Sequence, residues 1–454
     1  MWNDGAVSAA PSALLERVAA SVADLPAIDQ HCHSLIASWD SLGRTDAPGW
    51  RRCFTESVRP ASLGDDVAHS LGYREFLRAI AAFLGEPVGD LVDLEARVVR
   101  ARTAAVAEGR DVYARRLFDD ARISALLVDT AYASPVSTPA ATPADFVRTV
   151  GVPVRTIVRI ESVAEGCLAA GGRRSVTRVA FTEALLAELD RALAAGAVGF
   201  KSIAAYRVGL DLPDPAAAKV AGALRRIERG AQARRLDDPV IVAHVVWSAA
   251  RFAAERGVPM QFHVGIGDQD VQLPVADPTL LRPLLRDPST EACRIVLLHN
   301  HPFVDQAAYL ASVFPQVYVD LSLTIPLLGG AGAERAIASA LAMCPTTKLL
   351  AASDGHSYPE MHWRGMRLWR EALGRVLASE VEAGRMDEAE VVPIARDVLA
   401  GNSERLYRIE KRDPSEERTA RIDVGANRVH QPLHGEGRPA RRPQGTGEVG
   451  HQRD

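Results

Sequence analysis

Eight short apolar runs, rich in valine, isoleucine and leucine, alternate with helix-like segments along most of this 454-residue chain. Such runs are typical of strands that are buried on both faces of a parallel sheet. The runs are Leu25–His33, Arg122–Thr130, Val154–Glu161, Val198–Ile203, Val258–Val264, Arg294–His299, Val317–Leu323 and Lys348–Asp354. Eight strands that alternate with helices predict an α/β fold of the (β/α)8 TIM barrel type, whereas an open doubly wound sheet needs no eighth strand.

The first two predicted strands are separated by much more chain than one crossover helix requires. Apolar residues recur inside this segment at helical spacing, as at Phe76, Leu77, Ile80, Phe83 and Leu84. We therefore predict a helical insertion after strand 1, over about residues 40–121. The insertion either covers the barrel mouth, because loops that follow strands lie on the active-site face, or pads the outer ring of helices.

The chain divides by composition into three parts. Residues 1–24 are expected to form an N-terminal helical segment, and residues 25–411 the barrel with its insertion. Residues 412–454 are rich in glycine, proline and arginine and hold few large apolar side chains. This last part is therefore expected to be a disordered tail.

The composition argues against several classes of protein. The formal net charge is −4 and the isoelectric point is near 6.3, so no basic field indicates binding to nucleic acid. No apolar run approaches the roughly 18 residues of a membrane-spanning helix. The five cysteines form no CxxC pair, and the first residues lack the basic start of a signal peptide, so a cytoplasmic location is expected.

Polar side chains lie at the ends of several predicted strands. Strand 1 ends in His31-Cys32-His33, where the two-residue period of a strand turns both imidazoles to one face and Cys32 to the other. Four other strands contribute Lys201 (strand 4), His263 (strand 5), His299 (strand 6) and Asp354 (strand 8). Because the carboxyl ends of all the strands meet at one mouth of a barrel, these side chains are expected to converge.

A single histidine at a strand end is usually a surface group or a hydrogen-bonded core residue, and one HxH pair is a weak signal. Here five of the twelve histidines fall at or just beyond predicted strand ends. Several of them would repel one another or remain unsatisfied in one cleft without a bound ion or substrate. The pattern therefore predicts a divalent metal site, for which neutral imidazole is a good ligand.

The order of these residues resembles that of the amidohydrolase superfamily. Four longer segments are similar to the FluG-type branch, in which the amidohydrolase domain is often fused to a glutamine-synthetase-like domain. The segments are GFKSIAAYRVGL, QFHVGIGDQD, IVLLHNHPFVDQAAYLASVFPQVYVDLSL and LLAASDGHSYPE. The resemblance covers about Ala27 to Arg408 and implies a barrel enzyme that acts on a small molecule.

The resemblance also implies a metal site with two alternative forms. A first divalent metal, expected to be zinc, would be bound by His31, His33, His263 and Asp354. In relatives with two metals, a carboxylated lysine bridges them and the strand 6 histidine binds the second; Lys201 and His299 match these positions. In relatives with one metal, that histidine polarises the substrate, and Lys201 would instead bind an anionic substrate directly. The sequence does not choose between the two.

By this resemblance the chain is a metal-dependent hydrolase of an amide or related C–N bond, with Asp354 and His299 as catalytic residues. Asp354 would take a proton from the attacking water and return it to the leaving group. The expected substrate is small and carries a carboxylate, as a γ-glutamyl amide does. Its expected contacts are Arg207, beyond strand 4, and His356 and Glu360, beyond strand 8.

Two other functions fit the same residues. Relatives with similar ligands decarboxylate or isomerise carboxylated small molecules, and a barrel without activity could act as the partner of a separate glutamine-synthetase-like protein. Release of ammonia or an amine rather than carbon dioxide would separate hydrolysis from decarboxylation. The filled ligand positions speak against the non-catalytic role, and the sequence leaves open whether the chain forms a homo-oligomer.

Overall fold

The structure is a computed structural model, and it describes residues 13–42, 49–57, 66–89, 93–131, 139–170, 177–229 and 235–409. Within residues 1–24, where a helical segment was expected, the structure describes helix α1, Ala13–Ala23. The expected disordered tail, residues 412–454, lies outside the described residues.

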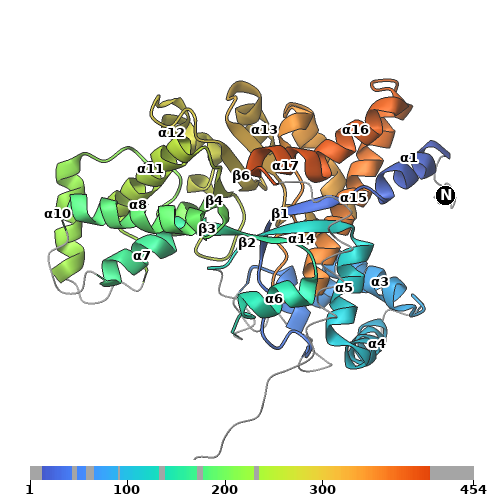
Figure 1. The fold of residues 1–454 in the computed structure, drawn as a ribbon. Helices are drawn as coiled ribbons and strands as arrows, with labels where there is room; N and C mark the ends of the chain where they lie inside the picture. The colour runs from blue at the N-terminus through green and yellow to red at the C-terminus, as the bar shows by residue number, and fades with distance from the viewer. Residues whose placement is uncertain are drawn as a thin grey trace, which may run out of the picture. The chain divides into compact units, whose positions relative to one another are not determined.

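Eight strands, paired in parallel and in chain order, form the sheet at the centre of the described protein (Figure 1). They are β1 (Ala27–His33), β2 (Ile123–Asp129), β3 (Val154–Arg159), β4 (Ala197–Ser202), β5 (Met260–Val264), β6 (Ile295–His299), β7 (Val317–Asp320) and β8 (Leu349–Leu350). Beyond β8, the Asp354 N–H donates to His31 O over 3.0 Å, and the His33 N–H donates to Gly355 O over 2.8 Å. These bonds bring the last strand back to the first, and the predicted (β/α)8 TIM barrel is confirmed.

Three observed strands end two or more residues before the apolar runs that predicted them. β3 ends at Arg159, so Glu161 lies in the first turn of a helix and not on the strand. β7 ends at Asp320, and β8 is only two residues long. The residues that follow, such as Leu321 and Ala351, remain fully buried outside the sheet. An apolar run therefore indicates where a strand lies better than where it ends.

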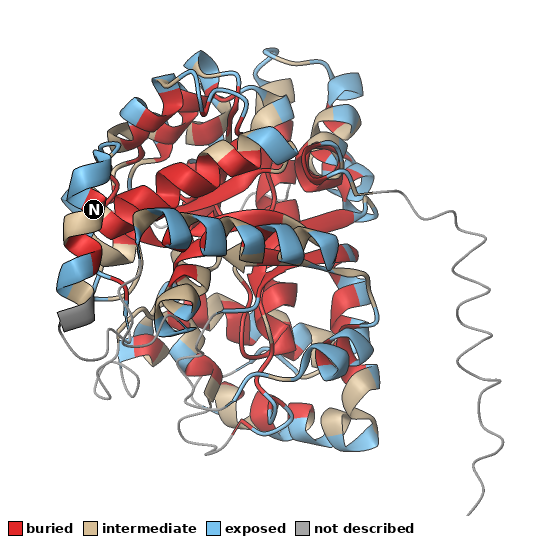
Figure 2. Cartoon of the chain, turned by 60° about the vertical axis from the view of Figure 1, so that its left-hand side comes forward, coloured by how far each residue is buried: buried red, intermediate tan, exposed pale blue. Residues whose placement is uncertain are grey.

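Helices surround the barrel, and Figure 2 shows that many of them have one buried and one exposed face, as expected of an outer ring. In the first half of the chain they are α2 (Val67–His69), α3 (Leu71–Leu84), α4 (Leu94–Glu108), α5 (Arg110–Asp120), α6 (Pro143–Val150), α7 (Ile160–Ala170) and α8 (Arg178–Ala194). In the second half they are α9 (Ala204–Arg207), α10 (Ala217–Arg229), α11 (Pro239–Arg256), α12 (Arg282–Arg286), α13 (Val304–Val313), α14 (Thr324–Leu341), α15 (Pro359–Glu382), α16 (Val391–Arg396) and α17 (Asn402–Tyr407). Shorter turns are η1 (Gly49–Phe54), η3 (Leu273–Val275), η4 (Pro278–Leu281), η5 (Thr346–Lys348), η6 (Glu388–Glu390) and η7 (Asp397–Gly401).

Apolar side chains form two separate cores. The smaller core combines strand residues with residues near the carboxyl end of the described chain, and it consists of Ile28, Ala125, Leu127, Ile157, Val296, Leu298, Leu350, Ala400, Leu406 and Tyr407. The larger core joins the opposite faces of the strands to the surrounding helices. The strands are thus apolar on both faces, as their sequences predict.

The helix before β5 shows how local sequence sets an element's limits. Asp238 caps α11, because its side chain accepts hydrogen bonds from the N–H groups of Val240 and Ile241, and Pro239 occupies a position that needs no donor. The helix ends at Gly257, whose φ of 64° is in the left-handed region. The cap and the glycine together determine where the chain enters β5.

The predicted insertion after strand 1 contains η1 and helices α2 to α5. Helix α3 packs against α14, and α5 packs against α15 and α6. In contrast, η1 carries Cys53 Sγ to 3.8 Å from Nδ1 of His356, which lies in the loop after β8. Most of the insertion therefore thickens the ring of helices, while η1 reaches the loops that follow the strands.

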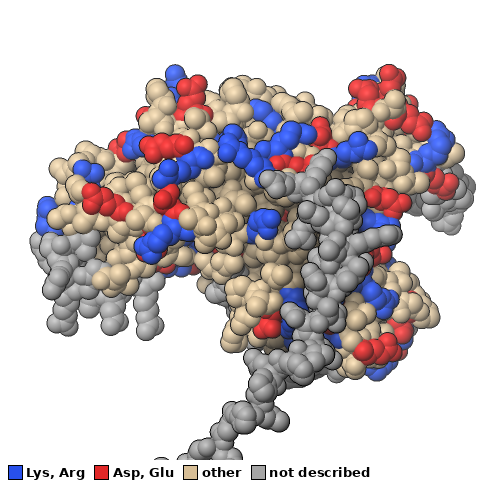
Figure 3. Space-filling view, viewed as in Figure 1, with Lys and Arg blue, Asp and Glu red and all other residues tan. Residues whose placement is uncertain are grey.

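The surface carries charges of both signs. On the face that Figure 3 shows, lysine and arginine side chains alternate with aspartate and glutamate, and no field of one sign extends across it. Among the described residues, no helix is both long enough and apolar enough to cross a membrane.

Candidate metal centre

The predicted ligands from three strands meet at the carboxyl end of the barrel. One ligand atom from each of His31, His299 and Asp354 lies within 4.8 Å of the other two. Nε2 of His33 lies 3.3 Å from Asp354 Oδ1, and Lys201 Nζ lies 3.0 Å from Nε2 of His31. The imidazoles and the lysine are buried, and the Asp354 side chain is only 10% exposed.

Hydrogen bonds orient both β1 histidines. Nδ1 of His31 lies 3.0 Å from Gln261 Oε1, and the amide group of Gln261 is oriented because its Nε2 donates to the backbone oxygen of Gln30 over 2.9 Å. Nδ1 of His33 lies 3.0 Å from the backbone oxygen of Asp129. Both Nδ1 atoms face acceptors and therefore carry the proton, so each Nε2 atom presents a lone pair.

Both of these lone pairs face the same carboxylate oxygen. Nε2 of His31 lies 3.1 Å and Nε2 of His33 lies 3.3 Å from Asp354 Oδ1. That buried oxygen has no hydrogen-bond partner among the described residues. Two imidazole lone pairs and a carboxylate repel one another unless a cation lies among them, so this donor set fits a divalent metal ion.

The protonation states also suit metal ligands. Burial lowers the pKa of His31 to about 4 and holds the pKa values of His263 and His299 well below the usual range. Burial alone would raise the pKa of Asp354, but the adjacent His299, His31 and His33 together hold it well below its usual range. Neutral imidazoles and an ionised carboxylate are the forms that bind a divalent cation.

Lys201 has an anionic neighbour as well as an imidazole neighbour. Its Nζ lies 3.3 Å from Asp129 Oδ2, and this ion pair favours the ammonium form. Burial lowers the pKa of Lys201, although Asp129 opposes this effect. The neutral amine is the form that can be carboxylated, so the two effects favour different roles for Lys201, and both predicted forms of the centre stay open.

Polar neighbours orient the two other predicted histidine ligands, His263 and His299. Nε2 of His263 lies 2.9 Å from the backbone oxygen of Ile266, which leaves Nδ1 as its acceptor atom, and its ring centroid is 4.5 Å from that of His299. Nδ1 of His299 accepts a hydrogen bond from the Leu323 N–H over 3.3 Å and contacts Ser322 Oγ at 2.7 Å. Nε2 of the neutral His299 ring therefore carries the proton and is the ring nitrogen that faces a ligand as a donor.

The backbone is strained around these ligands. Positive φ values, uncommon for residues other than glycine, occur at His299 (68°), Asn300 (67°), Asp354 (52°) and Ser357 (63°). His299 ends β6 and Asn300 follows it, while Asp354 and Ser357 lie in the segment between β8 and α15. Such strain persists where the surroundings enforce it, and it is often found at functional sites.

The three predicted substrate contacts are placed differently. His356 is buried near the cluster, with Nδ1 2.8 Å from Ser357 Oγ. Arg207 ends helix α9, and its Nη2 lies 3.1 Å from Glu165 Oε1, so the structure does not bring it to the cluster. Glu360 lies in α15 and not in a loop, with its side chain fully buried against Arg102. Arg207 and Glu360 therefore already have charged partners within the protein.

Sequence reasoning missed the polar residues that support the ligands. Gln261 accepts from His31 and donates to Tyr407 Oη over 2.8 Å, while the side chain of Gln30 donates to Asp320. The Asp320 carboxylate accepts from the backbone N–H of His299 over 2.8 Å. Gln261 could have been found, because it lies two residues before His263 on one strand.

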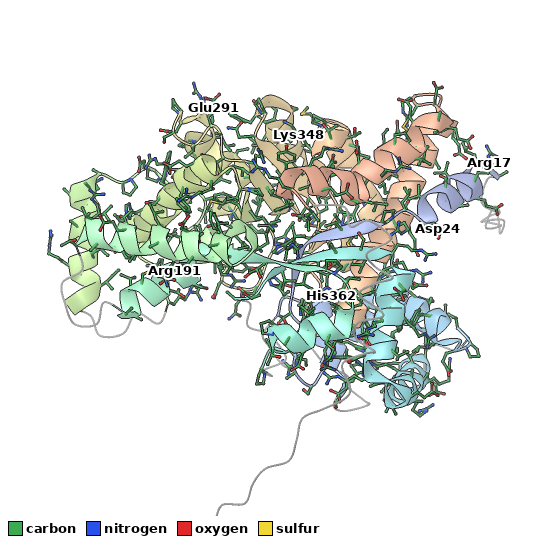
Figure 4. The ribbon with its side chains drawn as sticks, viewed as in Figure 1. Arg17, Asp24, Arg191, Glu291, Lys348 and His362 are labelled. Carbon is green, nitrogen blue, oxygen red and sulfur yellow. The ribbon has the colours of Figure 1, made fainter. Side chains whose placement is uncertain are left out.

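Three side chains on the outer side of β1 form a second buried cluster, composed of Asp29, Cys32 and His362. Figure 4 shows His362 inside the body of the protein, whereas Arg17 and Arg191 extend outward. Both carboxylate oxygens of Asp29 accept hydrogen bonds from Ser353, at 2.8 Å from its N–H and 2.5 Å from its hydroxyl. Asp29 thus ties β1 to the residue that precedes Asp354.

Comparison with known proteins agrees with this geometry. The amidohydrolase family model matches residues 28–409. The chain belongs to the amidohydrolase family. A solved structure from Lactobacillus casei, provisionally named a metal-dependent hydrolase, is 30% identical with a TM-score of 0.75, and the match covers 86% of this amidohydrolase and 97% of that protein.

A relative that matches part of its length and two proteins that share the fold complete the comparison. Protein fluG of Emericella nidulans is 31% identical over 230 residues, which is 48% of this amidohydrolase but only 26% of fluG. Uronate isomerase of Thermotoga maritima is 14% identical with a TM-score of 0.66, over 90% of this chain and 100% of the isomerase. Glucuronate isomerase of Caulobacter crescentus is 16% identical with a TM-score of 0.63, over 89% and 96% of the two chains. At these identities the isomerases share the fold alone.

Proposed function

We propose that this amidohydrolase is a metal-dependent hydrolase that cleaves an amide or related C–N bond in a small, carboxylate-bearing substrate. The observation that carries the proposal is the convergence of two imidazole lone pairs on one oxygen of Asp354, at 3.1 and 3.3 Å. The family match over residues 28–409 supports it.

Each residue of the centre has a role in this proposal. The metal would be held by His31, His33, His263 and Asp354, with Lys201 and His299 beside it. A divalent metal in such a site supplies a water of lowered pKa and polarises a carbonyl group. Asp354 takes the proton from the attacking water and returns it to the leaving nitrogen. His299 is held by Ser322 at 2.7 Å and directs its other ring nitrogen toward the substrate or a second ion.

Several finer points belong to the same proposal. The metal is zinc, as one or two ions, and Lys201 is carboxylated if there are two. The substrate is a γ-glutamyl amide or a related N-acyl amino acid, because the chain is similar to fluG and the FluG-type branch is linked to glutamine-synthetase-like enzymes. We also propose that the protein acts in the cytoplasm, as a monomer or a homo-oligomer.

The test is a substrate screen with protein loaded with zinc or manganese. γ-Glutamyl amines, N-acyl amino acids and aromatic carboxylates are offered, and ammonia or amine release is measured beside carbon dioxide release. Asp354→Asn is the control, since it should lose turnover. Release of carbon dioxide or isomerisation without amine release would replace hydrolysis by the second predicted function. Protein that retains neither zinc nor manganese after loading, and that turns over none of these compounds, would favour the non-catalytic role.

A further inference from the structure

A cationic side chain that the sequence did not single out lies beside the metal centre. Arg159 is the last residue of β3 and pairs in register with Lys201 on β4. Its guanidinium is 11% exposed and donates through Nε to Asp129 Oδ2 over 3.0 Å, and through Nη2 to the same oxygen. Among the described residues, its Nη1 has no hydrogen-bond partner.

Asp129 cannot balance the charge around it. Lys201 and Arg159 both bind its Oδ2, while its Oδ1 accepts from the backbone N–H of Ala131 over 3.1 Å. Arg159 and Lys201 therefore share one oxygen of one buried carboxylate, and the described residues show no second ion pair for Arg159.

The other carboxylate nearby, Glu161, is engaged through one of its oxygens, while its buried Oε2 has no hydrogen-bond partner among the described residues. Oε1 of Glu161 accepts from Ser202 Oγ over 2.6 Å and from the Ile203 N–H over 3.1 Å. Its carboxylate forms no ion pair with Arg159 among those the structure describes. Two buried cationic side chains that share one carboxylate are incompletely compensated, so this place is suited to an anionic ligand.

We propose that Arg159, and not Arg207, binds the carboxylate of the substrate. This inference rests on the proposed function for the reaction, but it concerns binding alone. The Nε and Nη2 edge of Arg159 is held by Asp129, so the guanidinium is oriented before a ligand arrives. Its other edge, formed by Nη1 and the second hydrogen of Nη2, matches a carboxylate in a bidentate pair.

The structure also explains why Arg207 is the poorer candidate. It lies at the end of α9, with Nη2 3.1 Å from Glu165 Oε1, and that carboxylate neutralises its charge. It contacts none of the residues of the metal centre. Arg207 therefore provides a matched control, since it is an arginine of similar burial, from the loop region after the next strand, whose charge is already paired.

The test measures binding to zinc-loaded, full-length protein by calorimetry. The probes are glutarate, its monoamide glutaramate, its diamide glutaramide, and inorganic phosphate. We expect Arg159→Met to weaken glutarate binding by about 30-fold to 100-fold, as the loss of a charge-assisted bidentate pair would. Glutaramide binding should not change, and Arg207→Met should bind glutarate as the unaltered protein does.

A second variant and a metal analysis separate recognition from structure. Arg159→Lys keeps the positive charge but loses the two parallel donors of the guanidinium. It should weaken glutarate binding by about tenfold, which is less than the loss expected for Arg159→Met. Zinc content should stay unchanged in both variants; loss of zinc together with affinity would show that Arg159 only supports the centre, and would overturn the inference.

The remaining outcomes also decide the matter. Unchanged glutarate binding in Arg159→Met, or loss of glutarate binding in Arg207→Met, contradicts the assignment. If Arg159→Met weakened phosphate binding but left glutarate binding unchanged, the group bound by Arg159 would be a phosphate and not a carboxylate. Because these measurements need no turnover, an inactive substrate screen would refute the proposed reaction without deciding the role of Arg159.

Discussion

The ion pair between Glu360 and Arg102 permits a sharp test, because Glu360 was expected to touch substrate. Both side chains are 0% exposed, and Arg102 Nε donates to Glu360 Oε1 over 2.6 Å. Arg102 also donates to the backbone oxygens of Trp39 and Asp40, at 2.6 and 2.7 Å. This pair therefore joins the loop after β1, the insertion and α15. Glu360→Gln would keep the shape of the side chain but leave the guanidinium uncompensated.

The expected loss of stability follows from that burial. Removing one partner of a buried ion pair costs about 3–5 kcal/mol. The entropy of melting is about 2.1 cal/mol/K per residue, which is about 0.8 kcal/mol/K for a unit of about 400 residues. We therefore expect Glu360→Gln to lower the Tm by about 4–6 °C, measured by circular dichroism on metal-loaded protein. KM measured well below the Tm should stay unchanged.

Glu388→Gln is the matched control, because the Arg17–Glu388 pair is exposed by 58% and 49% at the surface. Glu388→Gln should have the same Tm as the unaltered protein, because exposed ion pairs contribute little to stability. An unchanged Tm in Glu360→Gln would refute the buried pair. A raised KM with an unchanged Tm would instead restore Glu360 as a substrate contact.

Three further predictions concern the centre and its surroundings. His31→Ala or His263→Ala should lose bound metal, measured by elemental analysis, while the far-ultraviolet dichroism of the barrel is kept; full metal occupancy would show that the site is misplaced. If Lys201 is carboxylated, zinc reconstitution should need bicarbonate, and Lys201→Ala should be rescued in part by small carboxylic acids; indifference to both would support the single-metal form. Burial, with the nearby Asp354 and Asp268, raises the pKa of Glu56 from 4.5 to about 7, so the folded state binds the extra proton and loses stability as the pH rises through this interval. The change in Tm caused by Glu56→Gln should therefore be more favourable at pH 8 than at pH 5. An equal change in Tm at both pH values would contradict the raised pKa of Glu56.

The features that repeat along the chain were predictable from sequence. Eight apolar runs fixed the number of strands, and the alternation in His31-Cys32-His33 correctly turned the two imidazoles to one side. Arg159 was missed because the third run continued to Glu161, which moved the expected strand end past the residue that matters. Arg207 was expected in a loop, but a single helical turn carries it to Glu165, and nothing in a short apolar pattern indicates such a partner.

Contacts between distant parts of the chain could not be predicted in this way. Gln261 donates to the Tyr407 hydroxyl, 146 residues away, and accepts from His31, 230 residues away. Taken alone, Gln261 is a polar residue on a strand and Tyr407 an aromatic residue on a helix, and neither indicates a functional site. Their common function appears only when the barrel closes, because that brings the inward faces of β1 and β5 and helix α17 together.

One extra residue in β1 shows how the barrel core and the metal centre are joined. The pairing of β1 with β2 passes from Asp29↔Leu126 to Cys32↔Val128, so three steps on β1 match two steps on β2. Strict alternation would place Gln30 and His31 on opposite faces. The bulge lets the Gln30 side chain meet Asp320 and Gln261 while His31, the next residue, faces Asp354. Asp29, which precedes the irregularity, faces outward to Ser353 as ordinary alternation after Ile28 requires. Removing the irregularity would return Gln30 or His31 to the helical layer, so the ligand pair and its supporting network depend on the same local departure from strand geometry.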